Sequence, residues 1–246
     1  MQRIKILDCP LDVSTMDETV AFIDKSIENS AFIQHSVVNV AKLVNMQSDK
    51  TLKDSVSACN IINIDGMGVV LGARFLGYSV PERVAGIDLF HKLLELSEKR
   101  NYPVFFLGAK EEVLDKAISK IKNLYSNIKI SGFHHGYFWD DEEQVVQKIK
   151  NSRPKLLFVA ITSPKKENFI NRWNKELGVS FVMGVGGTFD VVAGNVSRAP
   201  VWMQDWGLEW LFRLIQEPGR MWKRYLVTNS KFAFLLIKEW LLQKRK

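Results

Sequence analysis

The sequence is poor in cysteine and opens without a long apolar run. Its two cysteines, Cys9 and Cys59, have no CxxC partner and no histidine at ligand spacing. Neither a disulfide framework nor a zinc site is indicated, so we expect two buried thiols in a reducing cytoplasm. The first 13 residues contain Arg3 and Lys5 but no apolar segment of the length that a signal peptide needs, so we expect no export.

Two motifs common in nucleotide-dependent enzymes are also missing. The chain has no Asp-x-Asp element to hold a divalent metal beside a nucleoside diphosphate, and its acidic run 140–143 favours the start of a helix instead. Residues 66–72 superficially resemble a dinucleotide fingerprint, but the third glycine is displaced and Asp88 falls in a helical pattern. These absences argue against a Rossmann dehydrogenase and against a soluble nucleotide-sugar epimerase.

Positive charge, by contrast, is in excess and unevenly distributed. The net charge is +7, which indicates an anionic partner. Residues 198–246 contain ten Lys and Arg against four Asp and Glu, so this stretch carries most of the excess. Five of the seven tryptophans lie there too, namely Trp202, Trp206, Trp210, Trp222 and Trp240. The last fifth of the chain is therefore both basic and aromatic.

Up to about residue 195, short β-branched runs alternate with amphipathic segments. This pattern predicts an α/β fold: a mostly parallel, Rossmann-like sheet flanked by helices. The predicted strands are 4–7, 36–40, 60–64, 104–107, 128–130, 156–161 and 181–184. The predicted helices are 17–28, opened by a capping box of Thr15 and Glu18, and 40–58, 87–99, 111–125, 142–151 and 164–177. We divide the chain into a catalytic domain, 1–195, and a C-terminal helical appendage, 196–246.

The appendage is predicted to be helical with a break at Pro218 and Gly219. Its longest apolar run, 232–237, cannot span a bilayer, but a helix rich in Trp, Phe, Leu, Lys and Arg can lie in the membrane interface. Spacing places a row of basic side chains on one face: Arg220, Arg224, Lys231 and Lys238. Apolar area comes from side chains that either meet lipid or pack on the main domain: Trp222, Tyr225, Phe232, Leu236 and Trp240.

Glycine-containing turns follow three of the predicted strands. In open α/β sheets, ligands bind beyond the carboxyl ends of the strands. The turns at 65–68, 108–110 and 184–190 would place backbone N–H groups around a diphosphate, or they only form tight turns. The glycines concerned are Gly108, Gly184, Gly186 and Gly187.

Polar side chains at the same strand ends are candidates for chemistry. Asp65, directly after a buried strand, is the candidate catalytic group, and its alternative role is to cap the helix that follows. Asn39 would hold a sugar hydroxyl or cap the helix from residue 40. Without an Asp-x-Asp element, a diphosphate would need arginines or backbone N–H groups, and the candidates are Arg83, Arg198, Arg213, Arg220 and Arg224.

Eight segments share an order and spacing that chance does not readily produce. They are 63–68 (NIDGMG), 80–89 (VPERVAGIDL), 105–108 (FFLG), 135–138 (HGYF), 184–190 (GVGGTFD), 193–200 (AGNVSRAP), 207–213 (GLEWLFR) and 217–225 (EPGRMWKRY). Together they resemble the WecG/TagA/CpsF glycosyltransferases over nearly the whole chain.

The resemblance implies an inverting transferase in bacterial cell-surface polysaccharide synthesis. It would move a hexose-type sugar, such as N-acetylmannosamine, its uronate or glucose, from a UDP-sugar to a polyprenyl-diphosphate-linked saccharide. Asp65 would then be the base for the acceptor hydroxyl, as direct displacement at the anomeric carbon requires. Arg83 would contact the sugar or diphosphate. Tyr137 would stack on the uracil or be a half-buried core aromatic, and the loop ending at Asp190 would follow the nucleotide.

The chain departs from the family pattern at one position. Many relatives have Gly-x-Pro-x-Gln-Glu after the sixth strand, where residues 163–167 here read SPKKE. Lys166 thus replaces the glutamine, while Glu167 keeps the glutamate. If this side chain touches the donor, a cation would change the sugar preference or help to neutralise the phosphates.

The expected partners are a UDP-sugar, the polyprenyl-diphosphate-linked acceptor and an anionic membrane. We expect a cytoplasmic protein peripheral to the inner face of the cell membrane, with no metal or other cofactor and no nucleic acid, and homo-oligomerisation is left open. Basic residues interleaved with aromatics also suit a rival, a non-enzymatic peripheral membrane or RNA-binding module. Such a module would not need Asp65.

Overall fold

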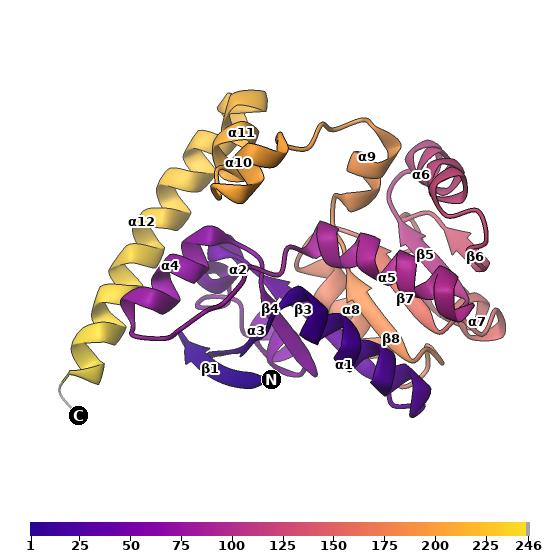
Figure 1. The fold of residues 1–246 in the computed structure, drawn as a ribbon, viewed down its shortest axis with the longest axis horizontal. Coiled ribbons are helices and arrows are strands. Elements are labelled where there is room, and N and C mark those ends of the chain that lie inside the picture. Colours follow the sequence, from indigo (N-terminus) through magenta and orange to yellow (C-terminus); the bar gives the residue numbers. More distant parts are fainter. Residues whose placement is uncertain (245–246) are drawn as a thin grey trace.

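The computed structural model describes residues 1–244, with Arg220 described by its backbone alone. Within these residues the chain forms an eight-stranded sheet of order β1-β2-β4-β3-β8-β7-β5-β6 (Figure 1). The pair β1–β2 is antiparallel and the other neighbours are parallel. The predicted α/β fold with a mostly parallel sheet is confirmed. The strands are β1 (Gln2–Ile6), β2 (Cys9–Val13), β3 (Ile33–Val38), β4 (Ile61–Ile64), β5 (Val104–Gly108), β6 (Ile130–His134), β7 (Leu156–Ala160) and β8 (Phe181–Gly184).

Helices cover both faces of this sheet. On one face, a hydrophobic cluster lies under α1, α5, α6 and α9. The opposite face has two clusters. One lies over β1–β4 and is covered by α2, α3, α4 and α12, and the other lies over β5, β7 and β8 and is covered by α7 and α8. The helices are α1 (Met16–Glu28), α2 (Val40–Asn45), α3 (Lys50–Ser57), α4 (Met67–Phe75), α5 (Gly86–Arg100), α6 (Glu111–Leu124), α7 (Glu142–Asn151), α8 (Lys165–Trp173), α9 (Thr188–Ala193), α10 (Val201–Asp205), α11 (Glu209–Gln216) and α12 (Pro218–Gln243).

Three local predictions were incomplete. The strand predicted at 128–130 lies at Ile130–His134, as β6. The strand β2 was missed because its hairpin turn, Leu7 and Asp8, has φ values of 49° and 62° without the usual glycine or asparagine. The single helix predicted over 40–58 is two helices, because Asp49 starts α3 by accepting from Leu52 N. The capping box of α1 is confirmed, as is the burial of both cysteines, whose thiol pKa values burial raises to about 12.

The appendage consists of α10, α11 and α12 (Figure 1). The predicted break is confirmed, since α11 ends at Gln216 and α12 has proline in its first turn, where a missing N–H is tolerated. Among the described residues, none of the helices combines the length and apolar character that crossing a bilayer requires.

The helix α12 packs along α2 and α4 rather than standing free. Phe232 and Leu236 belong to the core beneath α4, where a Cβ on Gly72 would come within 2.9 Å of both. Glu239 Oε2 accepts from Leu7 N at 2.9 Å. Of the two roles considered for the apolar side chains of this helix, Phe232 and Leu236 therefore have the packing role.

Candidate active site

The loops after β4, β3 and β8 lie together because these strands are neighbours in the sheet. Asp65 N donates to Val38 O at 3.0 Å, which places it beside Asn39. The Asn39 side chain caps α2 by accepting from Lys42 N at 3.0 Å, so the capping role considered for it is confirmed. Parallel strands thus bring together two polar residues that are 26 positions apart in the sequence.

Asp65 does not cap the helix that follows it. The N-cap of α4 is Gly66, without a side-chain hydrogen bond, so that alternative role is wrong. The carboxylate instead accepts from Gly86 N at 3.2 Å, at the start of α5. Burial raises the pKa of Asp65, while the charges of Arg83 and Arg213 and the Gly86 N–H act in the opposite direction. A carboxyl with a raised pKa, fixed at the end of a strand, is suited to accept a proton.

Two of the predicted arginines, Arg83 and Arg198, contact the same carboxylate, that of Glu209, near Asp65. Arg83 Nη1 lies 2.5 Å from Glu209 Oε2, and Arg198 Nε lies 3.4 Å from Glu209 Oε1. Arg198 also binds Asp88 in a bidentate pair, at 2.5 and 2.8 Å. The result is a chain of four charged groups, Asp88–Arg198–Glu209–Arg83, which we call the ion-pair chain. It links the loop before α5 and the first turn of α5 to the appendage.

The appendage also reaches the loop that carries Asp65. Gly207, between α10 and α11, has φ +70°, and a Cβ there would lie 2.3 Å from Met67 Cγ. Burial raises the pKa of both Asp65 and Tyr225, and the charge of Arg213, an exposed residue on α11, acts against that shift at both groups. Arg224 acts on Tyr225 in the same direction. Arg213 and Arg224 therefore lie in the same region of the appendage.

A second charged cluster is buried behind Asn39. Glu167 Oε1 lies 2.8 Å from Lys42 Nζ and 3.0 Å from Lys166 Nζ, and all three residues are buried. Burial alone would raise the pKa of Glu167, but the two lysines lower it to about 2. Burial and Lys42 lower the pKa of Lys166. With both lysines charged, this triad has a net positive charge, which suits a site for phosphate.

The glycines differ in what they do. Lys166 lies against Gly184, where a Cβ would come within 2.8 Å of the lysine stem. Gly186, with φ +56°, and Gly187 have open space where a Cβ would stand. Gly108 has φ +122° and approaches the carbonyl of Ala160 so closely that a Cβ would lie 2.3 Å from its oxygen. The β8 loop therefore has room beside its backbone, whereas Gly108 is needed for packing between β5 and β7.

The remaining predicted residues lie in other loops and helices. Tyr137 lies in the loop after β6, where Gly136 N donates to Ala109 O at 2.8 Å, so this loop lies beside the carboxyl end of β5. Tyr137 is 65% exposed, so the prediction of a half-buried core aromatic is wrong and an exposed ring remains. Asp190 lies in α9 and is half-buried, and Lys231 and Lys238 are exposed on α12. The Arg220 side chain lies outside what the structure describes.

Three charged residues of this region were missed from the sequence. Lys42 interrupts an otherwise apolar helix start, which was its one available signal. Asp88 and Glu209 stand in two segments of the family resemblance, 80–89 and 207–213, but neither was given a role. Their partners are distant in the sequence, with 126 positions between Arg83 and Glu209, so spacing gives no indication of the pairing.

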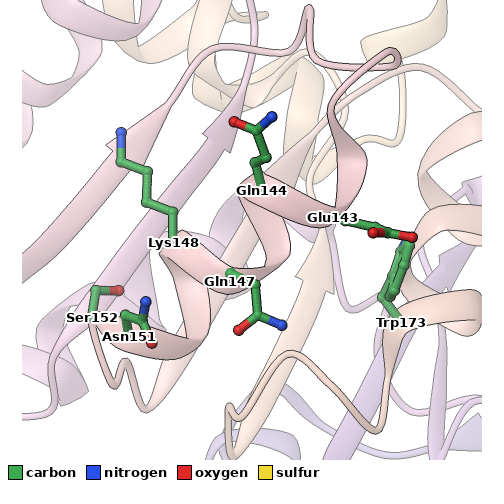
Figure 2. Close-up of a pocket in the computed structure, with 7 residues that line it drawn as sticks. All are labelled: Glu143, Gln144, Gln147, Lys148, Asn151, Ser152 and Trp173. Atoms are coloured by element: carbon green, nitrogen blue, oxygen red, sulfur yellow. The ribbon is translucent and has the colours of Figure 1, made fainter.

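Two surface hollows lie on the described part of the chain. One lies along α7 next to Trp173 (Figure 2), and is lined by Glu143, Gln144, Gln147, Lys148, Asn151, Ser152 and Trp173. Another adjoins the ion-pair chain and is lined by Met16, Asp17, Glu82, Arg83, Asp88, His91 and Lys92. In the described part of the chain, no three His, Cys, Asp or Glu side chains are grouped to hold a metal ion.

Comparisons with known proteins identify the family of this chain. The model of the glycosyl transferase WecG/TagA/CpsF family matches residues 4–246. A Bacillus subtilis (strain 168) protein is 35% identical over 245 residues, covering 97% of this chain and 93% of the relative. A Bacillus spizizenii protein is 37% identical over 171 residues, covering 70% of this chain and 66% of the relative. Both are named N-acetylglucosaminyldiphosphoundecaprenol N-acetyl-beta-D-mannosaminyltransferase. The resemblance seen in the sequence is confirmed, and the chain belongs to the WecG/TagA/CpsF family of glycosyl transferases.

Proposed function

We propose that this protein transfers an N-acetylhexosamine, N-acetylmannosamine in the first instance, from its UDP derivative to an N-acetylglucosaminyl-diphospho-polyprenol. The transferred sugar and the acceptor class come from the names of the two relatives, to one of which the chain aligns over nearly its full length, whereas UDP as the carrier is what the family resemblance implies. The observation that carries the chemistry is Asp65, a carboxyl with a raised pKa at the end of β4. A non-enzymatic module gives no reason for this arrangement.

The proposed reaction is a single displacement. The acceptor hydroxyl oxygen forms a bond to the anomeric carbon while Asp65 takes the hydroxyl proton. The bond from that carbon to the β-phosphate oxygen breaks, and its electron pair leaves with UDP. Attack from the face opposite the leaving group inverts the anomeric centre. The carboxylate and the cations must then lie on opposite sides of the reacting carbon.

Cations around the site support stabilisation of the departing diphosphate. The buried triad of Lys42, Lys166 and Glu167 adds net positive charge next to the β8 loop. Gly186 and Gly187 leave room along that loop for an extended ligand. Arg213 extends the positive field to Asp65 from the appendage. We propose that these groups hold the diphosphate without a divalent metal, so turnover should survive EDTA and should not depend on added Mg²⁺ or Mn²⁺.

We further propose that the appendage docks on an anionic membrane at the cytoplasmic face. On α12, Val227, Phe234 and Leu241 recur every seven residues and are exposed, with Phe234 70% exposed. Each residue of the basic row, Arg224, Lys231 and Lys238, precedes one of these apolar residues by three positions, so the two rows lie side by side on the helix surface. Apolar side chains next to lysines suit the membrane interface. The tryptophans of α10 and α11 add exposed aromatic area: Trp202, Trp206 and Trp210.

The decisive test is product formation with defined substrates. We would incubate the full chain with UDP-N-acetylmannosamine and N-acetylglucosaminyl-diphosphate on a short, soluble lipid, and detect the disaccharide product by mass. UDP-glucose and UDP-N-acetylmannosaminuronate would be run in parallel. Product from one of these alone would correct the donor, while no product from any of the three would contradict the proposed function. Protection against thermal unfolding by each UDP-sugar ranks the donors independently of turnover.

A further inference from the structure

We propose that Glu209 is a positioning residue: it holds Arg83 and Arg198 in the ion-pair chain and so docks the appendage in the arrangement that the Asp65 site needs. The inference rests on the proposed function of Asp65. Glu209 itself touches two arginines and is not assigned a contact with substrate.

The geometry of Glu209 is that of a bridge between segments. It is the first residue of α11, and each of its carboxylate oxygens faces a different arginine. Arg83 stands three residues before Gly86, whose N–H holds Asp65. Arg198 lies near the start of the appendage, before α10, and is bound to Asp88 in the first turn of α5. All of these contacts converge on the N-terminal end of α5.

The ion pair between Arg83 and Glu209 is more buried than a typical surface ion pair, so losing either partner costs more. The side chains of Arg83 and Glu209 are each 16% exposed. Removing one partner of such a pair leaves the other charge poorly solvated, which disfavours the docked arrangement. The position of Glu209 at the start of a helix also favours its negative charge. Docking of α11 and the placement of Arg83 are therefore coupled.

The bridge also sets the electrostatic surroundings of Asp65. The groups that act on Asp65 are Arg83 from the loop before α5, Gly86 N–H from α5, and Arg213 and Glu209 from α11. Glu209 raises the pKa of Asp65, whereas Arg83 lowers it. While Glu209 holds Arg83, the cation is shared with a second carboxylate. Without Glu209, the positive charge of Arg83 at Asp65 is no longer offset by this second carboxylate, so Asp65 becomes a weaker base.

The test compares Glu209→Gln with Glu112→Gln in the full chain. Glu112 is an exposed glutamate in the first turn of α6, so it controls for losing a charge at a helix start. For Glu209→Gln we expect kcat at neutral pH to fall on the order of tenfold, a smaller change in KM for the donor, and the acidic limb of the pH–rate profile to move to lower pH. Amide exchange in α11 should become faster. Glu112→Gln should leave all four measurements unchanged.

Several outcomes would overturn the inference. Wild-type turnover, pH profile and exchange in Glu209→Gln would show that the bridge does not matter. Faster exchange with unchanged turnover and pH profile would reduce Glu209 to a structural tether. Should Glu209→Gln not fold, Glu209→Asp keeps the charge but shortens the side chain, so it loosens the contacts with Arg83 and Arg198; wild-type turnover and exchange in that variant would equally overturn the inference. Full activity of Asp65→Asn would instead contradict the base assignment, so the two failures are distinguishable.

Discussion

Gly207 lies against Met67 so closely that no side chain fits between them: a Cβ at position 207 would stand 2.3 Å from Met67 Cγ. Met67 is two residues after Asp65, and Gly207 is two residues before Glu209. The contact therefore joins the appendage to the loop of the candidate base, two residues from Asp65 and two residues from Glu209.

The first prediction tests this contact with Gly207→Ala. The added Cβ collides with Met67 and also meets the penalty of φ +70°, about 1–2 kcal/mol for a residue other than glycine. We expect a loss of turnover on the order of tenfold or more, because the appendage is displaced from the Asp65 loop. Gly77→Ala is the matched control: its φ is +87°, but nothing lies within 4 Å of the added Cβ. Equal losses of turnover in both variants would mean that backbone strain, not the contact, is responsible.

The second prediction concerns Asp65→Asn. The amide can still accept from Gly86 N but cannot take a proton, so turnover should fall on the order of a hundredfold or more while UDP still binds. The melting temperature at pH 7 should stay equal or rise. The folded-state pKa of Asp65 is raised, so its contribution to stability is full below the unfolded pKa and is lost as pH rises through the folded pKa. Near-wild-type turnover would contradict the assignment of the base.

Much of this site could be read from the sequence because it lies at strand ends. A buried strand followed by Asp65, and another followed by Asn39, are local signals, and a parallel sheet brings them together without further information. The ion-pair chain has no such signal. Arg198 and Asp88 are 110 positions apart, and which of the many arginines pairs with which carboxylate depends on how the appendage folds back. The strand β2 could not be predicted for a related reason: tertiary packing holds Leu7 and Asp8 in a turn that glycine or asparagine usually forms.

The third prediction concerns the lysine that replaces the family glutamine. Lys166→Gln leaves Lys42 and Glu167 as a neutral pair and removes the net charge of the triad. If the triad meets the diphosphate, affinity for UDP should fall about tenfold, the worth of one hydrogen bond to a charged group. Lys165→Gln is the control, since Lys165 is adjacent but exposed, with its ammonium over the ring of Trp139. Calorimetric titration with UDP measures both affinities. Equal affinities in the two variants would show that Lys166 does not contact the diphosphate.

The fourth prediction is a loss of stability in mild acid caused by His35. This residue is buried on β3, with Nε2 2.8 Å from Asn63 Oδ1, and burial lowers its pKa to about 4. The unfolded chain binds the proton near pH 6.5, so stability is lost as pH falls from 6.5 towards 4, about 2 kcal/mol by pH 5. Urea unfolding of wild type and His35→Gln at pH 7 and pH 5 measures this, and the Gln variant should lose about 2 kcal/mol less. An identical loss in both proteins would assign the acid sensitivity to other groups.

The last prediction separates membrane docking from catalysis. Lys231 and Lys238 are exposed on α12 beside the apolar row of Val227, Phe234 and Leu241. Each lysine near an anionic surface contributes about 1 kcal/mol, so changing both to Glu should weaken binding to anionic liposomes about 30-fold or more. Turnover on the soluble acceptor should stay near wild type, because neither lysine takes part in the ion-pair chain or the triad.

The control for these two substitutions changes two exposed lysines outside the appendage. Changing Lys116 and Lys122, both exposed on α6, to Glu alters the net charge equally without touching the appendage. If both double variants lose liposome binding alike, the attraction depends on total charge and not on α12. If neither loses it, the basic row has no part in docking and the exposed aromatics must be tested next, with Phe234→Ser. A loss of turnover on the soluble acceptor in the α12 variant alone would show that this helix serves the active site as well as the membrane.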